Sequence, residues 1–190
     1  MDGSPARVFL GGPFAGTLSC GRMDPVYQQL YTALIRGLED AGFAVFSAHR
    51  NEEWGARLLP PGESTPADFA AVSRCDVFVA IPGDPPSLGT HVEIGWASAL
   101  GKPLVLLTGS EGARCALVRG IGTVARARWV ALAPERPDVD EVVRAVRGEL
   151  VAGGRQWRLF GSLPRPRDLK FLQSWTLSNG FVLHRYRRDR

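Results

Sequence analysis

The 190-residue chain has little cysteine, no long apolar segment and no basic leader. Its three cysteines, Cys20, Cys75 and Cys115, are odd in number and widely spaced, so they fit neither a disulfide framework nor a metal site. No apolar run approaches the roughly 20 residues that span a membrane. Residues 1–10 lack the regions of a signal peptide. We therefore expect a cytoplasmic protein that binds no membrane, metal or redox cofactor.

Positive charge is also scarce outside one end of the chain. Residues 151–190 hold 9 of the 23 Lys and Arg but only 2 of the 19 Asp and Glu, a net charge of +7, whereas residues 1–150 carry −3. The sequence pI of 9.3 therefore belongs to the tail. Nucleic acid is a possible partner only through this basic C-terminal extension.

The first 150 residues alternate short apolar runs with longer amphipathic segments. This pattern predicts an α/β fold, Rossmann-like and flavodoxin-like, with a five-stranded parallel sheet covered by helices on both faces. We expect strands over 7–12, 43–48, 76–82, 103–108 and 128–133, and helices over 25–42, 65–75, 90–101 and 138–153. For the span 109–127 the pattern indicates no more than the possibility of one short helix. Such folds place their sites in loops at the carboxyl ends of the strands.

A boundary is predicted at Gly153-Gly154, which divides the chain into a catalytic domain (1–153) and the extension (154–190). The extension is basic, aromatic and broken by proline. Asn179-Gly180 stands between two strand-like runs, which predicts a β-hairpin near 174–186.

Two acids are candidate catalytic residues, and both have an ordinary structural explanation. Thr90-x-x-Glu93 has the spacing of a capping box, and Asp68 likewise stands at the third position of a helix capped by Thr65. From spacing alone, capping is the more common role of each. The alternative is a carboxylate pair facing one crevice, in which one carboxylate attacks the anomeric carbon of a sugar.

Two loops resemble anion sites. Ser87 and Gly89 precede the helix of Glu93, where backbone N–H groups, a hydroxyl and the positive helix end suit a phosphate; an ordinary Pro-rich turn is equally compatible. The loop 11–24 is rich in glycine, including Gly12 and Gly16, but matches neither dinucleotide nor triphosphate motifs. Its small residues and Arg22 could hold a monophosphate.

The segment "SAHRNEEWG" (47–55) follows the second strand and offers His49, Arg50, Glu53 and Trp54 for a base pocket. His49 could equally be a strand-end histidine bonded to backbone, and Trp54 could be a core residue.

Taken together, "VFLGGPF", "ADFAAVSRCDVFVA" and "SLGTHVEIGWASALGKPLVLL" resemble the nucleoside 2-deoxyribosyltransferase-like superfamily over about residues 7–150. Within it, "GGPF", "SAHRNEEWG" and "GTHVEIGWASALGKP" are most similar to N-glycosidases of CMP and 5-hydroxymethyl-CMP in nucleoside-antibiotic pathways. The resemblance implies that Glu93 is the nucleophile or stabilises an oxocarbenium-like state, and that Asp68 orients Glu93 or the ribose.

The resemblance also implies binding roles. Ser87 stands where members that act on nucleotides hold the 5′-phosphate, and members acting on free nucleosides tend to have Asp there. Gly12, Phe14 and the loop through Gly16 to Arg22 correspond to the phosphate and base loop, and His49 to a histidine near the ligand. Ala15 replaces a residue that can be basic in relatives acting on a hydroxymethylated base. The family forms dimers or larger assemblies that share loops between subunits, which implies a homodimer with sites near the interface.

We therefore predict hydrolysis of the N-glycosidic bond of a pyrimidine nucleoside 5′-monophosphate, CMP or a 5-modified CMP, to free base and ribose 5-phosphate. One alternative is a nucleoside 2-deoxyribosyltransferase, against which Ser87 argues. The other is a non-catalytic nucleotide-binding or nucleic-acid-binding protein on the same fold, which the basic tail favours.

Overall fold

The computed structural model describes residues 4–109 and 115–152, and the backbone of strands at 169–176 and 182–188. The chain divides into two compact units, Met1–Leu159 and Phe160–Arg190. The predicted boundary at 153–154 lies outside the described residues. No helix in the described part of the chain is both long enough and apolar enough to cross a membrane.

The first unit is built on a five-stranded parallel sheet, as predicted. Its strands are β1 (Arg7–Gly11), β4 (Ala44–Phe46), β5 (Val77–Ala80), β6 (Leu104–Thr108) and β7 (Ala127–Ala131). They pair in the order β4-β1-β5-β6-β7, and every neighbouring pair is parallel. Counted along the chain, this is the flavodoxin-like order 2-1-3-4-5. Its topological switch point lies between β1 and β5, where this fold binds ligands.

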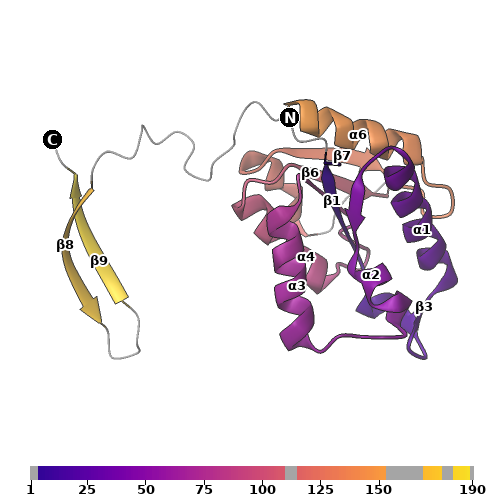
Figure 1. Cartoon of the computed structure of the whole chain (residues 1–190), viewed down its shortest axis with the longest axis horizontal. Helices are drawn as coiled ribbons and strands as arrows, with labels where there is room; N and C mark the ends of the chain where they lie inside the picture. Colours follow the sequence, from indigo (N-terminus) through magenta and orange to yellow (C-terminus); the bar gives the residue numbers. More distant parts are fainter. Residues whose placement is uncertain (1–3, 110–114, 153–168, 177–181, 189–190) are drawn as a thin grey trace. The chain divides into compact units, whose positions relative to one another are not determined.

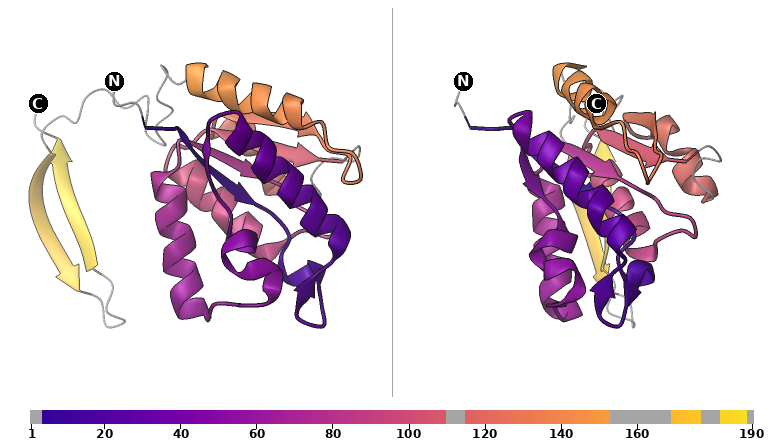
Figure 2. Two further views of the ribbon diagram at one scale, coloured as in Figure 1. Left: turned by 45° about the vertical axis from the view of Figure 1, so that its right-hand side comes forward. Right: turned by 90° about the vertical axis from the view of Figure 1, so that its right-hand side faces the viewer.

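Helices cover both faces of the sheet (Figures 1 and 2). The amphipathic α1 (Pro25–Asp40) and α6 (Val139–Val151) pack on one face, where the buried side chains include Tyr31, Leu34 and Val146. On the other face, α3 (Pro61–Arg74) and α4 (Leu88–Ala99) enclose a second cluster that includes Phe9, Phe78 and Ile94. The central strands are buried on both sides, which is why they are apolar throughout.

Two predicted helix starts are wrong. Helix α3 begins at Pro61, four residues before the predicted cap at Thr65, and Pro66 lies inside it. Helix α4 begins at Leu88 instead of position 90, because Ser87 is its N-cap. A proline is accepted at the first helical position because its missing N–H has no helical acceptor there. Pro61 stands at that position, whereas Pro66 lies in the interior of the helix.

Short elements complete the carboxyl edge of the sheet. The loop after β1 contains a 3₁₀ turn, η1 (Ala15–Thr17), and an unpredicted small hairpin, β2 (Leu18–Ser19) and β3 (Arg22–Met23). After β4 come α2 (Ala48–Asn51) and η2 (Glu53–Gly55). Within the span 109–127, residues 115–127 contain α5 (Ala116–Arg119) and η3 (Ile121–Thr123).

The second unit contains β8 (Leu169–Thr176) and β9 (Val182–Arg188), which pair antiparallel with a register shift between Phe171 and Gln173. These strands correspond to the predicted hairpin but reach further at both ends. The predicted turn at Asn179-Gly180 lies outside the described residues.

Candidate active site

Glu93 points to the switch point of the sheet. A methyl group built on Gly11, the last residue of β1, would lie 2.8 Å from Glu93 Oε2. The carboxylate therefore lies against the backbone where β1 ends. Any side chain at position 11 would displace it, so the first glycine of "GGPF" leaves room for a carboxylate from another element.

The capping-box explanation of Glu93 is wrong. Ser87 Oγ caps α4 and accepts hydrogen bonds from the Thr90 hydroxyl (3.0 Å) and, at 3.5 Å, from the Thr90 backbone N–H. Thr90 is thus the third helical residue, and Glu93 lies one turn deeper, beyond reach of the helix start. Its carboxylate therefore does not cap the helix.

The capping explanation of Asp68 fails in the same way, because Asp68 is the eighth residue of α3. Its negative charge instead affects the pKa of Glu93. Burial and the charge of Asp68 raise the pKa of Glu93 from 4.5 to about 8. Burial and the charge of Glu52 raise the pKa of Asp68 from 3.8 to about 6. These shifts agree with the predicted carboxylate pair, which stays a prediction, and near pH 7 the two acids together hold about one proton.

No cation offsets this pair in the described part of the chain, where no ion pair includes Glu93, Asp68 or Glu52. The same residues contain no group of His, Cys, Asp and Glu arranged to hold a metal ion. Carboxylates without a cationic partner favour positive charge, such as the charge that develops on a sugar when its glycosidic bond breaks.

Tyr31 and His49 support the loop after β1. Their rings stack with centroids 4.0 Å apart, and both donate to the carbonyl oxygen of Pro13, Tyr31 through its hydroxyl (3.3 Å) and His49 through Nε2–H (3.2 Å). Burial raises the pKa of Tyr31 well above its ordinary value, with smaller contributions from Tyr27 and then Glu93. Gly12 is required because an added methyl group would lie 2.1 Å from the Tyr31 hydroxyl oxygen.

His49 is only 2% exposed. The carbonyl of Pro13 can only accept, so the proton is on Nε2, and Nδ1 accepts from the hydroxyl of Ser47 (3.2 Å). Burial lowers the pKa of His49 to about 4. Both nitrogens of this predicted substrate-binding residue are thus engaged within the protein, where they hold the loop after β1.

Ser87 and Gly89 form an open helix start. The Ser87 hydroxyl accepts from Thr90, and no described residue accepts its proton. A methyl group built on Gly89 would meet nothing within 4 Å. The hydroxyl proton, the first backbone N–H groups and the positive helix end are together available to an anion.

The remaining predicted residues lie on the loop after β1. The Phe14 ring contacts the His49 ring, with centroids 4.8 Å apart. Gly16 and Arg22 are exposed, Gly16 in η1 and Arg22 on β3. None of the contacts described for the chain joins Gly16 or Arg22 to Glu93 or Asp68, so their roles stay predictions.

Two residues of the site were missed by sequence reasoning. Tyr31 stands among the apolar residues of α1, and its spacing carries no sign that its hydroxyl bonds to the loop after β1. Glu52 stands in "NEE" beside Glu53, and only its burial (7% exposed) distinguishes it.

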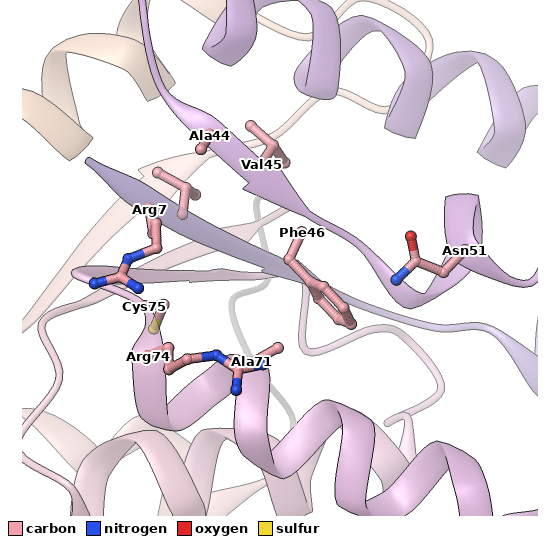
Figure 3. Close-up of a pocket in the computed structure, with 9 residues that line it drawn as sticks. Arg7, Ala44, Val45, Phe46, Asn51, Ala71, Arg74 and Cys75 are labelled. Carbon is pink, nitrogen blue, oxygen red and sulfur yellow. The ribbon is translucent and has the colours of Figure 1, made fainter. Parts of the chain in front are cut away.

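A separate cavity of about 250 Å³ lies between β4 and the C-terminal half of α3. Figure 3 shows Phe46 and Asn51 on one side of it and Arg74 and Cys75 on the other. None of the predicted site residues lines it, so it is distinct from the candidate site around Glu93.

Comparison with known proteins gives consistent matches. The family model for nucleoside 2-deoxyribosyltransferase matches residues 8–125. A mouse protein named 5-hydroxymethyl-dUMP N-hydrolase is 34% identical over 117 residues, which are 56% of this chain and 63% of the mouse protein, less than two thirds of its length. The solved Clostridium botulinum CMP N-glycosidase BcmB is 31% identical over 74% of this chain and 97% of its own (TM-score 0.55). The solution structure of BlsM is 44% identical over 77% of this chain and 90% of its own (TM-score 0.63).

Proposed function

Since this chain belongs to the nucleoside 2-deoxyribosyltransferase family, we propose that it is an N-glycosidase that hydrolyses a pyrimidine nucleoside 5′-monophosphate to the free base and the 5-phosphosugar. The observation that carries this proposal is the Glu93 carboxylate at the switch point of the sheet, whose pKa is raised by burial and by the charge of Asp68. The two acids come from separate helices, and neither acid caps its helix.

The proposed reaction uses the proton that the pair retains near neutral pH. Glu93 passes this proton to Asp68 and becomes a carboxylate. As the C1′–N bond breaks, its electron pair leaves with the base, Asp68 gives the base the proton, and a Glu93 oxygen bonds to C1′. Water then attacks C1′, releases Glu93 and returns one proton to the pair.

Ser87 supports a nucleotide in preference to a nucleoside. Its hydroxyl and the start of α4 offer donors and a positive dipole to a 5′-phosphate dianion. The same feature argues against the alternative of a deoxyribosyltransferase acting on free nucleosides. A mixture of deoxycytidine and adenine that yields deoxyadenosine would establish that alternative.

The choice of pyrimidine rests on the relatives. The names of the mouse and Clostridium botulinum proteins specify 5-hydroxymethyl-dUMP and CMP, both pyrimidine 5′-monophosphates. CMP or a 5-modified CMP is therefore the proposed substrate. A role in antibiotic biosynthesis and a cytoplasmic location stay predictions.

A chromatographic screen for released base tests the proposal. Nucleoside monophosphates are incubated with the full chain, with the matching nucleosides as controls. We expect base from CMP, little from cytidine, and a loss of at least about a hundredfold in kcat for Glu93→Ala. Release of cytosine by Glu93→Ala at nearly the wild-type rate would refute the mechanism.

The outer faces of α3 and α4 support a homodimer with its sites near the interface. Large apolar side chains four residues apart on α4 and its C-cap are exposed, Leu88 by 84%, Val92 by 51% and Leu100 by 44%. Trp96 continues this row and meets the exposed Phe69 of α3 edge-on, with centroids 5.3 Å apart. Such a stripe suits a second copy, and Val92 and Phe69 are sequence neighbours of the catalytic acids.

Sedimentation tests the dimer. The wild type should sediment at twice 20.6 kDa. Leu100→Asp should shift it to the monomer, while Val151→Asp, at an exposed site on α6, should not. A wild-type monomer at micromolar concentration would refute the dimer.

Nucleic-acid binding through the basic tail remains the non-catalytic alternative. It requires binding that weakens steeply with salt and is lost when the chain is cut after residue 153.

A further inference from the structure

The cavity between β4 and α3 is not used by the proposed function, and small side chains on both elements leave it open (Figure 3). Ala44 and Phe46 are two positions apart on β4, so they project to the same face of the sheet. Ala71 of α3 and its C-cap Cys75 are four positions apart and share one face of the helix. Three of these four side chains are small, which leaves about 250 Å³ between strand and helix unfilled.

One wall of this cavity is the end of an aromatic row. Phe78, Phe9 and Phe46 stand at paired positions on β5, β1 and β4. Their rings are stacked, with centroids 5.0 Å apart for Phe78 and Phe9 and 5.2 Å apart for Phe9 and Phe46. Because β4 is the edge strand, Phe46 is the last ring of the row, and it lines the cavity. A flat aromatic ligand would continue this stack.

The charged groups that line the cavity are both positive. They are Arg7 and Arg74, and no Asp or Glu is among the described lining residues. In the described part of the chain, the Arg74 guanidinium has neither an ion pair nor a hydrogen-bond acceptor. Arg7 has one carboxylate nearby, Asp76, whose Oδ2 lies 3.9 Å from Nε and also accepts the Arg7 backbone N–H. Both guanidinium groups therefore have donors available for an anion.

Most of the other polar groups of the wall are already bonded within the protein. The Cys75 thiol donates to the Val72 carbonyl (3.1 Å), and the Val45 carbonyl accepts from the Arg50 guanidinium (2.6 Å). The side-chain amide of Asn51 is the exception (Figure 3). An uncharged polar ligand, or a peptide strand added beside β4, would thus find fewer partners here than an anion.

We propose that this cavity binds a small aromatic carboxylate, with the ring stacked on Phe46 and the carboxylate bound by Arg74 and Arg7. The volume lies a little below the roughly 300 Å³ at which small-molecule sites usually begin, so the ligand is small. The proposal does not depend on the reaction at Glu93. Binding is measured without turnover, so failure of the proposed function leaves this test intact.

Indole-3-acetate is the probe, because it joins a bicyclic aromatic ring to one carboxylate. Indole-3-acetamide has nearly the same shape without the charge. The full chain, with ¹³C in its methyl groups, is titrated with each compound and followed by NMR. We expect indole-3-acetate to move the methyl signals of Ala44 and Ala71 with a Kd of about 1 mM or tighter. The amide should bind at least about fivefold more weakly.

Three results of this titration would overturn the inference. The first is that neither alanine signal moves at millimolar indole-3-acetate. The second is equal affinity for the acid and the amide, which would show that no cation recognises the ligand. The third is movement confined to the methyl signal of Thr90, beside Ser87, which would place the probe at the candidate active site.

A charge variant tests the role of Arg74. Arg74→Met keeps most of the length of the side chain and removes its charge, so it should weaken indole-3-acetate at least about fivefold and leave the amide unchanged. Arg144→Met is the matched control, because Arg144 is an exposed arginine of α6, on the opposite face of the sheet. Equal weakening in the two variants would reflect net charge alone and would overturn the inference.

A filling variant tests the cavity itself. Ala44 is exposed on a strand, where Ile is well accepted, so Ala44→Ile should retain the fold while it occupies the space. Neither compound should then move the Ala71 signal, and undiminished binding would overturn the inference. If Ala44→Ile does not fold, the comparison of Arg74→Met with Arg144→Met decides the question.

Discussion

Replacement of Glu93 by Gln should make the protein more stable above pH 8, although it abolishes the proposed reaction. Glu93 lies against the backbone of Gly11 and beside Asp68, where no described ion pair compensates its charge. The folded chain therefore holds the proton of Glu93 more tightly than the unfolded chain does. Gln is neutral at every pH and has nearly the same shape.

The sign and size follow from proton linkage. The pKa of Glu93 is about 8 in the folded chain against 4.5 ordinarily. An acid whose pKa is raised by folding destabilises the protein progressively as pH rises from the lower to the higher value. Each pH unit in that window lowers the free energy of unfolding by ~1.4 kcal/mol. The whole window therefore lowers it by at most ~5 kcal/mol. Glu93 is only half-buried and shares its titration with Asp68, so we expect a gain of about 2–4 kcal/mol for Glu93→Gln at pH 9.

Urea unfolding at pH 5 and pH 9 measures this gain. The free energies of unfolding of the wild type and Glu93→Gln should agree within ~1 kcal/mol at pH 5. At pH 9, Glu93→Gln should unfold at a higher urea concentration, and the slope of the free energy of unfolding against urea should be unchanged. Glu135→Gln, at an exposed position of the turn between β7 and α6, controls for the loss of one charge. A stability difference that is the same at both pH values would show that folding does not raise the pKa of Glu93, and the reasoning would fail.

Two further predictions concern the phosphate-binding residue Ser87 and the packing of Gly12. Ser87→Asp keeps an N-cap, so it should change the free energy of unfolding by less than ~1 kcal/mol, but its charge should repel the phosphate and raise KM for CMP at least about tenfold. The neutral cap Ser87→Asn should raise KM less, and equal KM values for the two variants would contradict phosphate binding there. Gly12→Ala should destabilise the chain by about 1–3 kcal/mol in urea unfolding, because the buried Tyr31 hydroxyl has no room to move, whereas Gly16→Ala meets nothing within 4 Å and should be neutral; a harmless Gly12→Ala would refute the close packing.

The regular alternation of apolar runs and amphipathic segments was enough to predict the sheet, its parallel strands and the helices on both faces. This works because a strand buried on both sides must be apolar throughout, and a helix that covers it must be apolar on one side. Helix starts were predicted less well. Both Thr65-Pro66 and Thr90-x-x-Glu93 have the local pattern of a cap, and the structure begins α3 at Pro61 and α4 at Leu88.

The residue types of the site could also be predicted, since acids, a serine and glycines follow strand ends in the sequence. Their roles could not. His49 was expected near the ligand, and the fold buries it beneath the loop after β1, with both nitrogens bonded to protein. Glu52 and Glu53 are identical side chains in adjacent positions, and only the left-handed turn that follows decides that one is buried and the other exposed.

The sequence by itself determined the fold class, the family and the acids available for chemistry, because those depend on periodicity and on residues close together along the chain. Only the tertiary structure decided where the Glu93 carboxylate lies and that it does not cap its helix. Its protonation depends on Asp68 from a helix 25 positions earlier and on the burial that Gly11 permits, and such effects exist only once distant segments meet at the edge of the sheet. The same spacing that suggested a cap from sequence is, in the folded chain, the position of a carboxylate that lies against the end of β1.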